Sequence, residues 1–199
     1  MIALDVETTG THPFKHSILA IGAIDLDDTS RQFYGECAMW DGAHLEEKAL
    51  EVNGLTEAEV RDPARGAEDA LVRDFLAWAL DCPTWNIVGQ SPAFDRDFIR
   101  EACARYHFDY PFPVRTIDTH TLAIMHMVRR GLNPPLSREH HRTDLSLDSV
   151  LEYCGIPPEP KPHNGLNGAL RHAEVYSRLL YGKPLLDEFA SYPMPWAGA

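Results

Sequence analysis

Two carboxylates lie two positions apart near the start of the chain, at Asp5 and Glu7. They fall at the end of an otherwise apolar segment, about Ile2 to Val6, that predicts a β-strand. Because residues i and i+2 of a strand point to the same face, the two side chains should lie together. Two like charges are costly to bury, and a divalent cation is the usual remedy. The alternative, a pair of solvated acids on an edge strand, is disfavoured by the apolar neighbours.

Two further residues could join this pair. Asp95 lies in VGQSPAFDRDFI, after a predicted strand and at the start of a helix. Alone it would be an acid favoured by the helix dipole, but a carboxylate at the end of one strand can meet acids on the next. His163 follows the proline-rich segment PPEPKP, which fixes its approach, although a lone histidine is more often a surface or core residue. With an ordinary pKa of about 6.5, a histidine can accept a proton near neutral pH.

The hydrophobic pattern predicts one α/β domain that would position these residues. Early strands followed by strands that alternate with helices favour a mixed β-sheet, with antiparallel hairpin strands and parallel strands, flanked by helices. Strands are expected at 2–6, 18–24 and 32–39 and within TWNIVG and VRTID, and helices at 71–79, 98–106, 122–128, 147–154 and 166–181. Segments 131–143 and 157–162 are predicted loops. The domain is expected over 1–184, with 185–199 as a tail packed on or near it.

Composition narrows the function classes. The chain has 199 residues and a net charge of −12, the wrong sign for a protein that coats a duplex through its phosphates. A metal-dependent nuclease is still compatible, because cations can lie between carboxylates and phosphates. The sequence shows neither a secretory signal nor a membrane-spanning apolar run, so a cytoplasmic protein is expected. Its four cysteines are scattered and form no CxxC pair, which favours reduced structural thiols.

Several segments together resemble the DEDDh (DnaQ-like) 3′-5′ exonucleases. ALDVETTG is similar to the first motif of that family, GQSPAFDRDFI to the second, and HNGLNGALRHAEVYSRLLYGK to the third, which carries His-x4-Asp. VRTIDTHTLA and SLDSVLEYCGI also resemble segments that accompany these motifs. The similarity covers nearly the whole chain in the family's order.

The resemblance implies a ribonuclease H-like fold that binds two divalent ions, Mg²⁺ or Mn²⁺. Asp5 would bridge both ions, Glu7 would complete one, and Asp95 would hold water on the other. His163 would be the general base that activates water. The expected partner is a nucleic acid with a free 3′ end, single-stranded or frayed. Residues implied to bind its terminal nucleotide are Thr8, Thr9, Gly10, Leu55 and Phe94, although each could equally be a turn or core residue.

The chain departs from the family pattern at Gly168, where the fourth acid would stand. A glycine inside a helix costs about 1 kcal/mol relative to alanine, so helix propensity does not explain it. The site could be weakened, another acid such as Asp144 could replace the ligand, or the protein could be inactive. Gly168 is expected to face Asp5 and Glu7, and Gly168→Asp is expected to be tolerated and to strengthen metal binding.

Three functions therefore remain. A metal-dependent 3′-5′ exonuclease, with full activity or with activity weakened by Gly168, is the leading hypothesis. The alternatives are a catalytically inactive nucleic-acid-binding or polymerase-associated relative, and a small-molecule hydrolase with a carboxylate-metal site. A basic group formed by Arg129, Arg130, Arg138 and Arg142 either borders the substrate path or belongs to a solvated loop.

Overall fold

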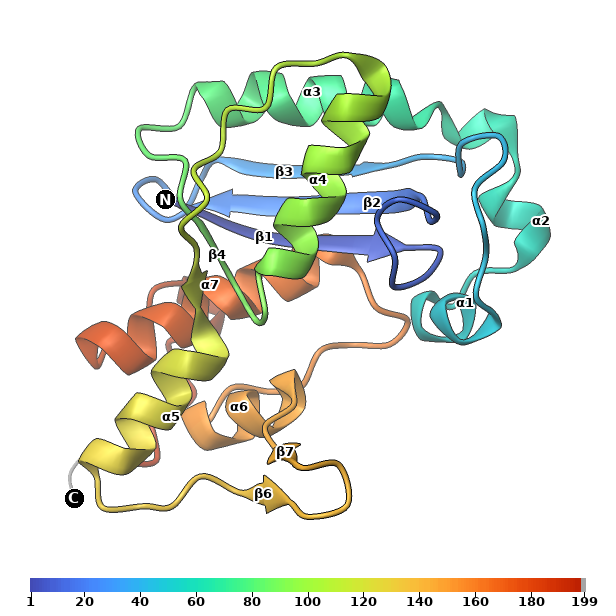
Figure 1. The fold of residues 1–199 in the computed structure, drawn as a ribbon. Helices are drawn as coiled ribbons and strands as arrows, with labels where there is room; N and C mark the ends of the chain where they lie inside the picture. Colours follow the sequence, from blue (N-terminus) through green and yellow to red (C-terminus); the bar gives the residue numbers. More distant parts are fainter. Residues whose placement is uncertain (198–199) are drawn as a thin grey trace.

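The computed structural model describes residues 1–197 and shows a five-stranded sheet with helices on both faces (Figure 1). The strand order is β3-β2-β1-β4-β5. The strands are β1 (Ile2–Thr8), β2 (Ile18–Asp25), β3 (Gln32–Glu36), β4 (Ile87–Gly89) and β5 (Ile117–Asp118). The first three strands pair antiparallel, and β4 and β5 continue the sheet parallel to β1. The predicted mixed sheet is confirmed.

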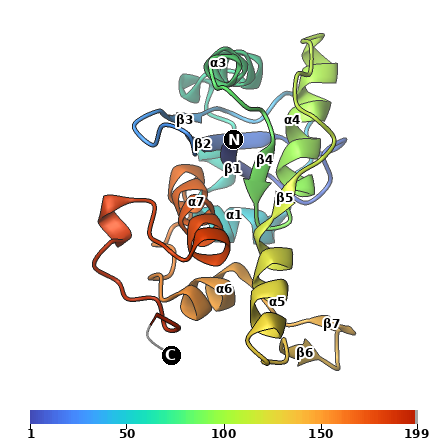
Figure 2. The ribbon, with the colours of Figure 1, turned by 90° about the vertical axis from the view of Figure 1, so that its left-hand side faces the viewer.

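Helices form one layer on each face of this sheet (Figure 2). One layer contains α3 (Glu68–Leu80) and α4 (Ala93–Tyr106), and the other contains α5 (Thr119–Arg129), α6 (Leu147–Cys154) and α7 (Gly165–Tyr181). Two large apolar clusters fill the spaces between the sheet and these layers. All four cysteines are buried in them with free thiols.

Strand β1 lies in the middle of the sheet, between β2 and β4. Its alternation directs Ile2 and Leu4 into the core beneath α3 and α4, whereas Ala3 packs on the side of α7. Asp5 and Glu7 share the parity of Ala3 and so lie toward α7. A pair of solvated edge-strand acids is therefore the wrong interpretation.

Helix α7 begins very close to the sheet because two glycines meet there. A Cβ atom on Gly22 of β2 would lie 2.0 Å from the carbonyl carbon of Gly165, the first residue of α7. A Cβ atom on Gly165 would in turn lie 2.9 Å from the backbone oxygen of Asp5. Since real Cβ atoms do not approach this closely, side chains at either position would push the helix away. The glycines thus bring the start of α7 next to the acids of β1.

The short elements differ most from the prediction. Strand β3 ends at Glu36, and two helices precede α3: α1 (Glu47–Asn53) and α2 (Glu57–Val60). A small hairpin, β6 (Leu136–Ser137) with β7 (Arg142–Thr143), lies inside the predicted loop 131–143. Strands of two residues are too short to show a periodic pattern, which explains that error.

The C-terminal segment lies against the helices of the second layer. A 3₁₀ turn at Asp187–Phe189 buries Phe189, and the Trp196 ring lies 5.1 Å from that of Tyr153. The last two residues of the predicted tail, 198–199, lie outside the described residues. No helix within residues 1–197 is long and apolar enough to cross a membrane.

Candidate active site

Asp95 joins the acids of β1 because the chain turns sharply between β4 and α4. Ser91 adopts a left-handed backbone (φ 56°) in this turn, and α4 starts two residues later. Asp95 lies in the first helical turn, where the helix dipole favours an acid. It is only 3% exposed, and its Oδ1 accepts a hydrogen bond from the Val6 N–H at 3.0 Å. The structure therefore places Asp95 against the strand that carries Asp5 and Glu7.

Burial raises the pKa of all three carboxylates, and repulsion between acids adds to the shift of two of them, Asp5 and Glu7. Burial raises the pKa of Asp5 well above its ordinary value, and repulsion from Asp95 and Glu7 adds to the effect. Burial, then repulsion from Glu159 and Asp95, raises the pKa of Glu7 to about 7. Burial also raises the pKa of Asp95 to about 7, although the Val6 N–H opposes this shift.

These acids lack a basic partner. Within residues 1–197, none of Asp5, Glu7 and Asp95 forms an ion pair with a lysine, arginine or histidine. Oxygen ligands of this kind are what Mg²⁺ and Mn²⁺ prefer in proteins. A group of converging, uncompensated carboxylates therefore fits divalent cations.

His163 lies next to this group, and it is accompanied by an acid that the sequence did not single out. The Nδ1 atom of His163 lies 3.5 Å from Oε2 of Glu159. Single ligand atoms of Glu7, Glu159 and His163 all lie within 4.8 Å of one another. The one signal in the sequence is an acid inside the proline-rich segment PPEPKP, whose composition predicts only a loop.

Gly168 lies in the first turns of α7 and faces Asp5, as expected. A Cβ atom there would lie 2.1 Å from Oδ2 of Asp5 and 2.7 Å from its Cγ. An aspartate at 168 would require the Asp5 side chain to shift, so the expectation that folding tolerates Gly168→Asp stays a prediction. Asp144, the suggested replacement ligand, is exposed after β7 and lines a separate hollow with Gln90 and Ser91.

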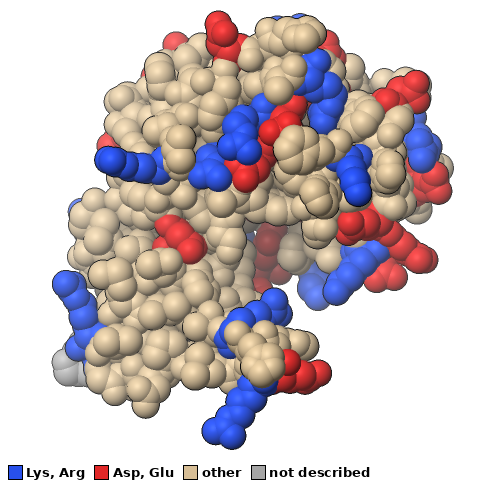
Figure 3. Space-filling view, viewed as in Figure 1, with Lys and Arg blue, Asp and Glu red and all other residues tan. Residues whose placement is uncertain are grey.

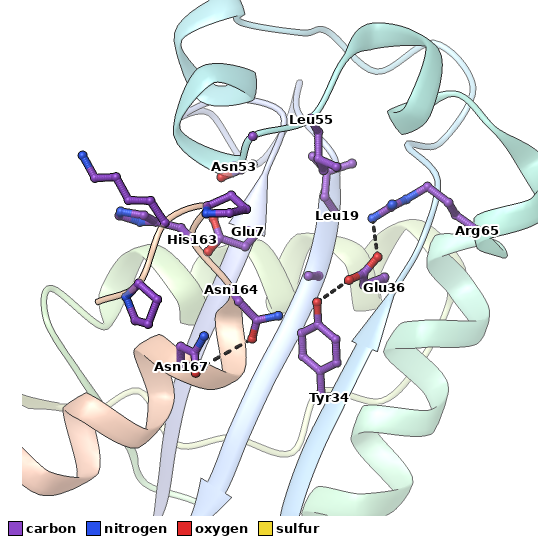
Figure 4. A pocket seen from close by; sticks show the side chains of 15 residues that line it. Glu7, Leu19, Tyr34, Glu36, Asn53, Leu55, Arg65, His163, Asn164 and Asn167 are labelled. Carbon is purple, nitrogen blue, oxygen red and sulfur yellow. Dashed lines mark hydrogen bonds and ion pairs between the residues drawn. The ribbon is translucent and has the colours of Figure 1, made fainter. Parts of the chain in front are cut away.

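A cavity of about 420 Å³ opens beside Glu7 and His163 (Figure 4). Figure 4 shows these two residues on one side and Arg65 with Glu36 on the other. Arg65 is held by an ion pair with Glu36 at 2.7 Å, and Glu36 also accepts a hydrogen bond from Tyr34. The other residues that line the cavity are Leu19, Ala20, Asn53, Gly54, Leu55, Pro160, Lys161, Pro162, Asn164 and Asn167. Leu55 is thus the one predicted nucleotide contact that lies at this cavity.

The other predicted nucleotide contacts do not line it. Thr9 is fully buried, its hydroxyl donates to the His44 carbonyl, and its N–H donates to the Ser17 carbonyl. Thr8 is also buried, and its hydroxyl donates to the Gly10 carbonyl. These turn residues therefore bond mainly to the protein itself.

Phe94 lies in the first turn of α4, 37% exposed, with its ring 4.8 Å from that of Phe98. It is available for stacking but is not part of the cavity wall.

The predicted basic group divides into two pairs, of which Arg138 and Arg142 line one hollow at the β6–β7 hairpin. Arg129 and Arg130 lie at the end of α5, and the Arg130 guanidinium lies 5.9 Å from the Trp196 ring centroid. Arg142 also lines the hollow that contains Ser91 and Asp144. The space-filling view shows acidic atoms deep in a recess, with basic side chains at its edge (Figure 3).

A central strand carrying acids, inside a mixed sheet covered by helices, is a ribonuclease H-like architecture. Solved structures agree with this fold. Escherichia coli Exonuclease I with a bound oligonucleotide superposes with a TM-score of 0.68 at 19% identity, covering 89% of this chain. The chain spans about two fifths (40%) of Exonuclease I. Cell-death related nuclease 4 gives a TM-score of 0.67 at 18% identity, over 89% of this chain and 62% of that one.

Sequence comparison identifies the family. A family model described as Exonuclease matches residues 2–176. Ribonuclease T of Shewanella oneidensis is 32% identical over 217 residues, covering 97% of this chain and 90% of that protein. The 3′-5′ DNA exonuclease Cap18 of Escherichia coli is 30% identical over 180 residues, 88% of each chain. The chain therefore belongs to the exonuclease family that includes ribonuclease T.

Proposed function

We propose that this protein is a metal-dependent 3′-5′ exonuclease that releases nucleotides from single-stranded or frayed nucleic-acid ends. The observation that carries the proposal is the gathering of Asp5, Glu7 and Asp95, without basic partners among residues 1–197, beside His163 and an open cavity. Membership of an exonuclease family agrees with it.

In this function Asp5, Glu7 and Asp95 would hold the divalent ions, Mg²⁺ or Mn²⁺. When bound, two such ions offset the charge on a phosphodiester and make water a stronger nucleophile. His163 is the general base that takes a proton from the attacking water, and its half-exposed ring suits that role. The cleaved bond is the last phosphodiester, so one nucleotide leaves with each hydrolysis.

The cavity supplies contacts for the terminal nucleotide. Leu55 offers an apolar surface against the last base, and the exposed ring of Phe94 at the start of α4 is available for stacking. Arg65 and Lys161 are the basic residues that line the cavity and can contact phosphates. Thr8, Thr9 and Gly10 shape the turn after β1 and so support this site.

The direct test is incubation of the native chain with Mn²⁺ or Mg²⁺ and oligonucleotides labelled at the 5′ end, of DNA and of RNA. We expect a ladder that shortens from the 3′ end and disappears with EDTA or in Asp5→Asn. A 3′ phosphate or other 3′ block should slow it, whereas a 5′ block should not.

Gly168 gives a specific reason to consider the second function, an inactive nucleic-acid-binding relative. That function predicts oligonucleotide binding without any ladder in either metal. Such a result, or cleavage that survives Asp5→Asn, would refute the proposed exonuclease.

A further inference from the structure

Helix α7 supplies no carboxylate to the acids of β1. Gly168 has no side chain, and the Asp5 carboxylate already fills the space beside it. The first acid on the helix is Glu174, which is fully buried in an ion pair with Arg178 at 2.6 Å. A further ligand must therefore come from another segment.

Glu159 lies in the loop just before α7 and is only 8% exposed. Its Oε1 accepts a hydrogen bond at 3.1 Å from the N–H of Asn164, the residue that caps α7. The carboxylate is therefore fixed to the start of the helix. One of its oxygens lies within 4.8 Å of a carboxylate oxygen of Glu7.

Three glutamates are buried among the described residues, and Glu159 differs from the other two. Glu68 pairs with Arg105 at 2.6 Å, and Glu174 pairs with Arg178. Glu159 forms no ion pair with an arginine or lysine within residues 1–197; His163 lies 3.5 Å from it, and Arg171 acts on it electrostatically from beyond ion-pair distance. A buried carboxylate without a cation in contact is costly, most of all beside other acids. Its placement is explained if a cation is bound there.

We infer that Glu159 is the fourth carboxylate of the metal site, replacing the ligand that Gly168 lacks. Ligand atoms of Glu7, Glu159 and His163 lie within 4.8 Å of one another. Two oxygens on opposite sides of Mg²⁺ would lie about 4.2 Å apart, so a small adjustment lets Glu7 and Glu159 share one ion. The inference rests on the proposed function, since it assigns a further residue to the same site.

The competing role for Glu159 is to orient His163 without touching the metal. The two roles differ in what they require. A metal ligand is needed for cation affinity whether or not the imidazole is present. A positioning residue loses its effect once His163 is removed.

The experiment is calorimetric titration of Mn²⁺ into the metal-free full chain, for the native protein, Glu159→Gln, His163→Ala and the double variant. Glu152→Gln on α6 is the matched control, since it makes the same charge change at an exposed position. We expect Glu159→Gln to weaken Mn²⁺ binding about 100-fold, because outer partners of metal ligands already account for about 10–100-fold. The same loss should appear in the His163→Ala background, and Glu152→Gln should change affinity less than twofold.

A loss of at least about tenfold that persists without His163 supports the inference. A smaller loss, or one that disappears in the His163→Ala background, overturns it. Glutamine can still accept the Asn164 N–H, so the loop should keep its fold, which circular dichroism checks. If Glu159→Gln does not fold, Glu159→Asp, which shortens the side chain by one methylene, is judged by the same thresholds. If the native chain binds no Mn²⁺, the proposed function fails as well; if it binds and cuts while Glu159 has no effect, only this inference fails.

Discussion

Asp95 offers a direct measure of how much a buried acid of the site costs the fold. It is buried beside Asp5 and Glu7 and has no basic partner within residues 1–197. In Asp95→Asn the side-chain oxygen can keep the hydrogen bond from the Val6 N–H, so the shape of the site should survive. We expect the variant to be more stable than the native chain when metal is absent, although it loses activity.

The size of the gain follows from the pKa of Asp95, which burial raises from 3.8 to about 7. Because the folded state holds the proton more tightly than the unfolded state, stability falls as pH rises between these two values. The cost is absent below about pH 4 and complete above about pH 7, where it reaches at most about 4 kcal/mol. Because the amide of asparagine must also be buried, we expect a gain of about 2 kcal/mol at pH 8, or roughly 4–8 °C in Tm.

Thermal unfolding followed by circular dichroism in EDTA, from pH 4 to pH 8, measures this gain. Asp97→Asn is the control, because Asp97 lies on the same helix but pairs with Arg96 at 2.8 Å and should not gain stability. With saturating Mn²⁺ the native chain should become more stable than Asp95→Asn. A ligand at 100 times its Kd adds about 2.7 kcal/mol to the free energy of unfolding of the native chain. No gain for Asp95→Asn at pH 8, or an equal gain at pH 4, would refute the cost assigned to burying the ionised Asp95 carboxylate.

Three further outcomes test the site. His163→Gln should lower kcat by about 10²–10⁴-fold and change Mn²⁺ affinity less than threefold; a loss of metal affinity as large as the loss of kcat would make the imidazole a ligand instead. Arg65→Ala should raise KM and reduce the salt dependence of oligonucleotide binding, and Arg73→Ala on the exposed face of α3 serves as control; equal salt slopes for both would exclude a phosphate contact. Gly168→Asp should lower Tm in EDTA through about 1–3 kcal/mol of overpacking, offset by only about 0.3 kcal/mol because aspartate is little better than glycine in a helix, and Mn²⁺ should raise its Tm more than that of the native chain. A higher Tm in EDTA, with no added response to Mn²⁺, would show that position 168 does not face Asp5.

The parts of the fold that the sequence predicted are those with long, regular patterns. The acids of β1 were found because strand alternation is strict, and the five long helices because their apolar faces repeat over several turns. The short helix α2 was missed although Thr56 and Glu59 form a capping box, a signal that is readable in sequence. The sequence therefore does contain a local signal for the start of α2.

The rest of the site depends on contacts between residues far apart in the sequence, which no local sequence pattern encodes. The Thr9 hydroxyl bonds to a carbonyl 35 residues away, so its structural role was not visible in the turn sequence. Arg65 reaches the cavity through Glu36 on β3, and Glu159 reaches the acids only because the loop folds back at the start of α7. A motif indicates which residue types to seek, whereas tertiary packing decides which atoms meet.

The glycine at 168 and the carboxylate at 159 belong to one arrangement. Because Gly22 and Gly165 hold the start of α7 against the sheet, a side chain at 168 would overlap the Asp5 carboxylate. Helix α7 nevertheless positions Glu159, because Arg171 donates hydrogen bonds to the carbonyls of Pro157 and Pro158 at 3.3 and 3.1 Å. These bonds, with the one from the Asn164 N–H, hold the loop that presents Glu159. A functional side chain keeps its geometry only when its supporting contacts are rigid. Helix α7 carries no metal-binding acid of its own, but its capping residue Asn164 and Arg171 hold Glu159 in place.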